Sequence, residues 1–344
     1  MSSPHVLVVG AGAIGAFFAS RLATVPGVTV SAICRSNYKA VVANGLRVTS
    51  PVFDETVLRP AFTFCSPDEA RESKQKHDTK WSHLLVATKL IQELGDPSAL
   101  LDGLVNEGSS IVLMQNGLGI EDPYKKRFPQ ATIISSTTRT SAIQNKPGHI
   151  KHNFLTRTTI GPFTPNANET TSDIATQRTQ EFAALLHSAG IPDVDILDHA
   201  GMQFARWHKT AINAAMNPTA VLARGPTNRA MVLDEELEIH LKAVMKEVLD
   251  VACKILGQPL PEWLPRIADV IQGVKGDTSG SHPSMWVDWE AGRKVELEAI
   301  LGNPLRQARE HGLVLPRTQT IYALLKKAQE VRENQHSIES KLQT

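Results

Sequence analysis

The first half of the chain alternates short apolar runs with longer mixed segments. Because a strand that is covered on both faces has no polar side, continuous apolar or β-branched runs predict buried parallel strands. Such runs occupy residues 6–9, 28–34, 83–88, 109–114 and 131–136. Helical composition between them favours right-handed crossovers, so we expect an α/β fold with a doubly wound parallel sheet.

Weaker patterns extend this half of the chain. Short β-rich runs stand at 46–49 and 56–58. Residues 148–161 are expected to add an antiparallel pair of strands to the sheet. A helix over 173–188 and a last strand over 194–196 are expected to complete it.

From about Asp198 the apolar residues recur at the spacing of a helix instead. Helical segments are expected at 199–223, 230–256, 263–272, 290–311 and 317–333. We therefore predict two domains, an α/β domain over 1–197 and an all-α domain over 198–344. The polar residues 334–344 are expected to fray as a disordered tail.

Charge and cysteine content narrow the class of protein. The 344 residues carry 36 basic and 35 acidic side chains, and this balance gives no indication of a nucleic-acid surface. No apolar run approaches the roughly 20 residues of a membrane span. The three cysteines are far apart, and a strand begins too near the N-terminus to leave room for a signal peptide, so we expect a cytoplasmic protein.

Two histidines raise the question of a metal site. His149 and His152 are spaced as H-x-x-H within a predicted strand. That spacing puts the two side chains on opposite faces of the strand. We therefore predict no metal there.

The turn after the first strand carries a dinucleotide-binding pattern. Residues 10–15 read Gly-Ala-Gly-Ala-Ile-Gly between a buried strand and a helix. Gly10 permits the tight turn, Gly12 lets the backbone approach a pyrophosphate, and Gly15 lets the helix lie close to the strand. The free N–H groups at the start of the helix would face the phosphates. Ala11, Ala13 and Ile14 complete the predicted cofactor-binding segment.

Residues at the ends of three strands refine this cofactor site. Where NAD-selective folds place an acid after the second strand, this chain has Arg35, which favours the 2′-phosphate of NADP. Lys89 and Asn116 also follow predicted strands. Because the carboxyl ends of parallel strands share one edge, we expect both on the side of the glycine turn.

One helix of the second half carries a polar stripe. Lys209, Asn213 and Asn217 stand at i, i+4 and i+8 among small and apolar residues, so they lie along one helix face. Polar groups on a packed helix need partners if they are buried. The spacing alone also fits a solvent-facing stripe on an amphipathic helix.

At these motifs the sequence resembles the ketopantoate reductases (2-dehydropantoate 2-reductases). The resemblance covers most of the chain, and the Lys-x3-Asn-x3-Asn-Pro helix is its most specific part. The matching motifs, in order, are residues 10–15, Thr88-Lys89, 115–119, 207–209 with 217–220, Ser284-Met285, and 295–298 with Gly302. The resemblance implies an N-terminal Rossmann domain and a C-terminal helical domain, with the active site in the cleft between them.

The resemblance also implies roles for individual residues. Lys209 matches the proton donor, and Glu296 matches an acid near the nicotinamide ribose and that lysine. Asn116 matches a residue that contacts both cofactor and substrate. The remaining implied contacts are Asn213, Asn217 and Ser284 for the substrate, and Arg35, Lys89 and, through its backbone, Ser141 for the cofactor. For Glu298 and Asp288 we expect a solvated helix face.

Departures from the family pattern fall near the implied substrate pocket. A simple count places Thr227, with Asn228 beside it, where relatives often have an asparagine. Leu301 replaces the polar residue that usually precedes the glycine, and residues 279–284 differ from the usual run. Reaction type and cofactor are therefore better defined than the substrate.

The expected function is NADPH-dependent reduction of 2-dehydropantoate to (R)-pantoate in pantothenate biosynthesis, with hydride transfer to the keto carbon and Lys209 as proton donor. One alternative is a related NADP-dependent reductase of another 2-keto acid, such as 2-ketoisovalerate, or a D-2-hydroxy acid dehydrogenase. Another is an NADP-sensing protein without catalysis, although a sensor needs neither Lys209 nor Glu296. The expected partner is a small 2-keto acid; relatives commonly form homodimers through the helical domain.

Overall fold

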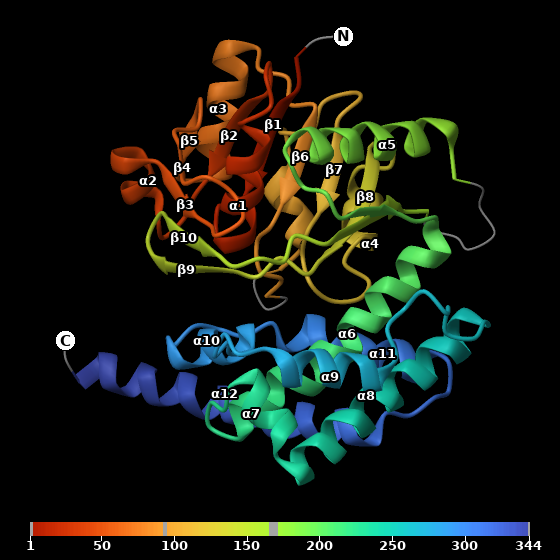
Figure 1. Cartoon of the computed structure of the whole chain (residues 1–344). Helices are drawn as coiled ribbons and strands as arrows, with labels where there is room; N and C mark the ends of the chain where they lie inside the picture. The colour runs from red at the N-terminus through yellow and green to blue at the C-terminus, as the bar shows by residue number, and fades with distance from the viewer. Residues whose placement is uncertain (1–2, 92–94, 165–170, 343–344) are drawn as a thin grey trace. The chain divides into compact units, whose positions relative to one another are not determined.

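The computed structural model describes residues 3–91, 95–164 and 171–342, with side-chain burial up to residue 335. By its internal contacts the chain divides into two compact units (Figure 1). The first comprises Met1–Lys89, Asp96–Gln115 and Ile120–Met202. The second comprises Leu90–Gly95, Asn116–Gly119 and Gln203–Thr344. The predicted domain boundary after residue 197 stays a proposal.

The first unit is built on an eight-stranded sheet in the order β12-β11-β8-β7-β6-β1-β2-β5. Its strands are β1 (His5–Val9), β2 (Thr29–Ile33), β5 (Thr63–Phe64), β6 (His83–Val86), β7 (Ser110–Leu113), β8 (Thr132–Thr138), β11 (Thr158–Pro162) and β12 (Val194–Ile196). From β8 to β5 neighbouring strands are parallel, and β11 is antiparallel to β8. The predicted doubly wound α/β fold is confirmed.

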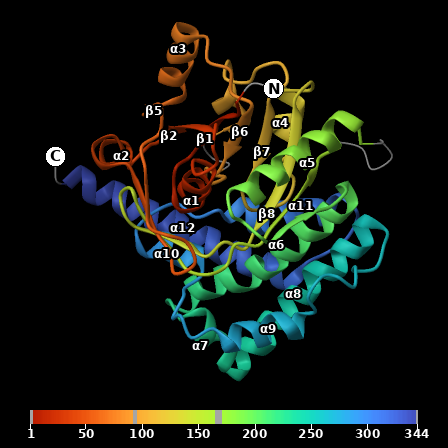
Figure 2. The ribbon, with the colours of Figure 1, turned by 45° about the horizontal axis from the view of Figure 1, so that its top comes forward.

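Both faces of the sheet are covered, which explains the continuous apolar runs. Val6 and Val8 of β1 share a buried cluster with Phe17 of α1 (Ala13–Leu22) and Phe182 of α5 (Asp173–Ser188). These two helices contact each other on that face (Figures 1 and 2). Leu7 points the other way and is also fully buried. The remaining helical segments of this unit are α2 (Tyr38–Asn44), α3 (Pro67–His77), η2 (Pro97–Leu101) and α4 (Asp122–Arg127).

A second sheet corrects one prediction. Its order is β4-β3-β10-β9, formed by β3 (Leu46–Thr49), β4 (Thr56–Leu58), β9 (Ala142–Lys146) and β10 (His149–His152). The prediction of an antiparallel pair over 148–161 is wrong, because β10 pairs with β3 and β9, whereas β11 joins the main sheet. Strand β10 packs on α1 and not in the main sheet, because the buried His152 ring stacks on Phe17 at 4.4 Å between centroids.

The second unit is helical, as predicted. After α6 (His199–Leu222), which begins in the first unit, it contains α7 (Asn228–Leu233), α8 (Glu235–Leu256), α9 (Ile267–Gly276), α10 (Ser284–Glu290), the π-helical segment η3 (Glu298–Gly302), α11 (Asn303–Glu310) and α12 (Pro316–Leu342). Leu241, Val244 and Val248 of α8 form part of its buried core. Among the described residues, no helix has both the length and the apolar character needed to cross a membrane.

Three helical predictions are corrected. The helix over 230–256 is interrupted at Asp234, whose carboxylate accepts a hydrogen bond from the Leu237 N–H and so starts α8. Within 290–311, helix ends at Glu290 and resumes only near Glu298. The supposed disordered tail continues α12 to Leu342, since Gln, Glu and Lys are good helix formers. Residues 343–344 lie outside the described part.

Candidate active site

The glycine turn has the geometry that a pyrophosphate requires. Gly10 has φ +96°, and a Cβ there would lie 2.8 Å from Thr88. A Cβ at Gly15 would lie 3.1 Å from the Ala87 Cβ. At Gly12, by contrast, an added Cβ meets no described atom within 4 Å, and the residue is exposed. The tight packing behind and the open space in front of α1 fit the phosphates of a dinucleotide.

The start of α1 is also suited to an anion. Gly12 is its N-cap and no acidic residue stands in its first turn. No side chain of this helix therefore competes as an anion for the N–H groups and the positive end of the helix dipole.

Two cationic residues share the sheet edge with the glycine turn. Arg35 follows β2 and Lys89 follows β6, and both are exposed. Because β2, β1 and β6 are adjacent and parallel, their carboxyl ends lie along one edge. In the described part of the chain, Arg35 has no ion-pair partner. A guanidinium placed there can receive a phosphate.

Ser141 and Asn37 belong to the same unit. Ser141 precedes β9; its hydroxyl accepts a bond from the Asn153 side chain at 3.0 Å, and its carbonyl accepts one from the Asn153 N–H at 2.8 Å. Sequence reasoning did not single out Asn37, a buried residue two positions after Arg35. Its amide donates to the Ala11 carbonyl at 2.8 Å, inside the glycine turn. Its place shortly after the second strand, as the N-cap of α2, was the only available signal.

The polar stripe of α6 runs from an accessible to a buried position. Lys209 and Asn213 are partly exposed, whereas Asn217 is 3% exposed. Among the described residues, the Asn217 Nδ2 has no hydrogen-bond partner. A buried, unpaired amide costs about 1–3 kcal/mol, so such a group calls for a ligand or another explanation.

Glu296 joins Asn116 in the second unit. It is 8% exposed, and its Oε2 accepts from the Asn116 Nδ2 at 3.3 Å. Its Oε1 accepts from the Leu90 N–H at 3.0 Å. The carboxylate is therefore bonded through both oxygens, as burial of a charged group requires. The structure thus brings these two predicted residues together.

The other acidic residues of this region do not form a solvated face. Asp288 is buried and accepts from the Arg293 Nε at 2.9 Å. Glu298 is partly buried and accepts from Tyr322 and Arg306. The predicted solvent-facing role is wrong for both, because each is paired with a cation from a later turn. Ser284 is exposed as the first residue of α10.

The positions that depart from the family pattern have structural partners. The Thr227 hydroxyl accepts from the Ala230 N–H and caps α7. Asn228 donates to the Ser281 hydroxyl at 3.0 Å. Leu301 is fully buried in the apolar core of the unit.

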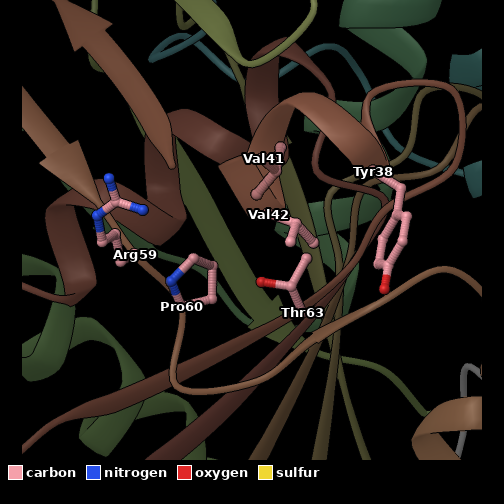
Figure 3. A pocket seen from close by; sticks show the side chains of 6 residues that line it. All are labelled: Tyr38, Val41, Val42, Arg59, Pro60 and Thr63. Atoms are coloured by element: carbon pink, nitrogen blue, oxygen red, sulfur yellow. The ribbon is translucent and has the colours of Figure 1, made fainter. Parts of the chain in front are cut away.

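A separate hollow lies on the first unit (Figure 3). Tyr38 stands at one end, Arg59 and Pro60 at the other, and Val42 and Thr63 between them. None of the predicted site residues lines it.

Comparisons with known proteins agree with this architecture. The family model "Ketopantoate reductase PanE/ApbA" matches residues 6–165, and its C-terminal counterpart matches 202–329. The chain is 27% identical over 327 residues to 2-dehydropantoate 2-reductase from Nostoc sp., with 95% of each protein covered.

Solved structures show the same similarity. The chain is 31% identical to the crystal structure of 2-dehydropantoate 2-reductase from Methylococcus capsulatus, with a TM-score of 0.78 and coverage of 95% and 97% of the two chains. A dimeric ketopantoate reductase from Staphylococcus aureus shares the fold, with 23% identity, a TM-score of 0.68 and coverage of 95% and 99%. The chain therefore belongs to the ketopantoate reductase family of oxidoreductases.

Proposed function

We propose that this enzyme reduces 2-dehydropantoate to (R)-pantoate with NADPH. The observation that carries the proposal is the stripe of Lys209, Asn213 and Asn217, which ends in a buried amide nitrogen that has no partner among the described residues. An unpaired amide donor suits an oxygen acceptor. 2-Dehydropantoate offers carboxylate, keto and hydroxyl oxygens to it.

The first unit would hold the cofactor. The open space at Gly12 and the start of α1 suit the pyrophosphate. Arg35 would bind the 2′-phosphate, Lys89 would contact a cofactor phosphate, and Ser141 would contribute a backbone contact. When bound, the reduced nicotinamide supplies the hydride.

Lys209 is assigned the proton transfer. As negative charge develops on the keto oxygen, an ammonium group stabilises it and then donates a proton. Glu296, whose two oxygens already accept bonds from Leu90 and Asn116, is assigned to keep the lysine charged and oriented. Asn116, Asn213, Asn217 and Ser284 would bind substrate oxygens without adding a competing charge.

The assignment is tested by steady-state kinetics on a panel of 2-keto acids, each with NADPH and with NADH. We expect the highest kcat/KM for 2-dehydropantoate with NADPH. If 2-ketoisovalerate ranks well above it, the enzyme is a reductase of another branched 2-keto acid. Tight NADPH binding without turnover of any keto acid would favour a sensor.

Asn217→Ala provides the matched test of the substrate pocket. Removing the amide donor should raise KM for 2-dehydropantoate while leaving the Kd for NADPH unchanged. An unchanged KM would show that Asn217 does not donate to the substrate, and would contradict the substrate assignment.

We further propose a homodimer, supported by the dimeric relative from Staphylococcus aureus. Size-exclusion chromatography with light scattering measures the mass directly. A mass of one chain at micromolar concentration would contradict this part of the proposal.

A further inference from the structure

The segment Asn116–Gly119 is attached to the second unit through its backbone. Gly117 has φ +104°, and a Cβ there would lie 2.6 Å from the Ala299 carbonyl oxygen in η3. The Gly117 carbonyl accepts from the Arg206 Nη1 at 3.2 Å. The next carbonyl, that of Leu118, accepts from the Asn303 Nδ2 at 2.6 Å. Two buried side chains thus hold two successive carbonyls of the loop.

The orientation of the Asn303 amide is set from its other side. Its Oδ1 accepts a hydrogen bond from Arg306, which can only donate. The Nδ2 must therefore face the Leu118 carbonyl. Asn303 is 9% exposed, so water competes little for either bond.

Glu298 and Tyr322 extend this network. Glu298 Oε2 accepts from the Arg306 Nη1 at 2.6 Å, and Oε1 accepts from the Tyr322 hydroxyl at 2.5 Å. Burial acts to raise the pKa of Glu298, but bonds from Tyr322 and Arg306 outweigh it and lower that pKa. The carboxylate is thereby kept charged and able to anchor Arg306.

The network surrounds an unusual helical turn. Glu298–Gly302 is π-helical. This conformation is rare in proteins overall, and where it occurs it is often at a functional site. Glu296 lies two residues before this turn, and Asn303 is the first residue after it. One short stretch of chain therefore carries both the acid that accepts from Asn116 and the amide that holds the loop of Asn116.

We propose that Asn303 is a positioning residue for keto-acid reduction, which holds the loop so that Asn116 donates to Glu296. This inference rests on the proposed function. Glu298 and Tyr322 act through Arg306 to orient Asn303. None of these four residues is assigned contact with the substrate or cofactor.

A double-mutant cycle of Asn303→Ala and Asn116→Ala tests the inference. If Asn303 acts through Asn116, its loss should lower kcat/KM for 2-dehydropantoate by about 10- to 100-fold in the wild-type background. In the Asn116→Ala background the further loss should be less than about twofold. If Asn303→Ala lowers kcat/KM by the same factor in both backgrounds, the role of Asn303 is merely structural and the inference is overturned.

Asn303→Asp separates folding from positioning. An aspartate still accepts from Arg306 but cannot donate to the Leu118 carbonyl. We expect kcat/KM as low as in Asn303→Ala, with a Tm nearer to wild type. Wild-type kcat/KM in this variant would also overturn the inference.

Arg309→Ala is the matched control on the same helix, because the Arg309 side chain bonds only to Gln319 among the described residues. It should leave kcat/KM unchanged. If Asn116→Ala alone retains full kcat/KM, the proposed role of Asn116 fails and the inference fails with it. If the reductions in kcat/KM of the two single variants simply multiply in the double variant, the inference is overturned, but the proposed function is not.

Discussion

The amide of Asn37 donates a hydrogen bond to the carbonyl of Ala11 at 2.8 Å and so connects the start of α2 to the glycine turn. A second, longer bond of 3.2 Å runs from the same amide nitrogen to the Gln144 side chain in β9. The backbone of the glycine turn is thus held by a side chain that the dinucleotide pattern does not include.

Asn37→Ala should weaken NADPH binding and lower the free energy of unfolding by about 1–3 kcal/mol, because the Ala11 carbonyl loses its buried donor. Fluorescence titration of NADPH and urea denaturation measure the two effects. Gln144→Ala is the control: it removes only the partner in β9 and should affect NADPH binding less. Equal effects of the two variants would contradict the role given to the Ala11 bond.

Arg35→Asp should lower the preference for NADP over NAD by about 10- to 100-fold, since a charge-assisted bond is lost and a repulsive charge is introduced. The ratio of kcat/KM for NADPH and NADH measures it. Arg35→Lys, which keeps the charge, should retain most of the preference. A ratio that Arg35→Asp leaves unchanged would exclude the predicted phosphate contact.

Lys209→Ala should reduce kcat by about 100- to 10,000-fold, the usual contribution of a general acid. The Kd for NADPH should change little, because the predicted cofactor contacts lie mainly in the other unit. Single-turnover kinetics and fluorescence titration separate the two effects. Near-normal kcat in this variant would rule out Lys209 as the proton donor.

Gly117→Ala should cost more stability than Gly257→Ala, although both glycines have positive φ, +104° and +67°. An alanine at 257 meets no described atom within 4 Å and pays only the cost of a left-handed residue, about 1–2 kcal/mol. An alanine at 117 also collides with the backbone of Ala299. Urea denaturation of the two variants checks the order, and kcat/KM should fall only for Gly117→Ala.

His83 should make the protein less stable in acid. Burial and the nearby charge of Arg178 lower its pKa from 6.5 to about 4, although Glu181 acts in the opposite direction. The folded state therefore favours the neutral ring. This contribution is complete above about pH 6.5 and is lost as the pH falls toward 4, amounting to about 3 kcal/mol.

Denaturation by urea at pH 7 and pH 4.5 measures this effect. His83→Gln should show a smaller loss of stability between the two pH values than the wild type. The pKa values of the partly buried His5 and the buried His152 are also lowered by burial and act in the same direction, so only the difference between proteins is informative. Replacement of the exposed His187 should keep the wild-type loss.

Most of the fold could be predicted from local sequence patterns. The strands around Val8, Leu85 and Val112 were predictable because burial on both faces leaves a continuous apolar run. The pairing of β10 with β3 was not, since it joins residues about a hundred positions apart and depends on the surface that Phe17 offers to His152. Helix α8 was recognisable from its apolar stripe, but its start depended on the cap at Asp234.

The sequence pointed to some residues of the candidate site and not to others. The glycine turn follows from its pattern, whereas spacing places Lys209, Asn213 and Asn217 on one helix face and leaves the role of that face open. Asn37 and Asn303 were not singled out, and Glu298 was wrongly expected to be solvated, because their importance lies in bonds to backbone or side chains far along the chain. A sequence pattern records which residue types recur, whereas these bonds depend on how loops meet helices.

The grouping of Asn116–Gly119 with the second unit has a consequence for cutting the gene in two. Leu118 is a member of the apolar core of that unit, and its carbonyl satisfies Asn303. A C-terminal fragment starting at Gln203 would carry a core with one side chain missing and a buried amide without its acceptor. The N-terminal and C-terminal halves of the gene therefore cannot be exchanged independently between relatives. A chimera must take Asn116–Gly119 from the same parent as the helices of the second unit.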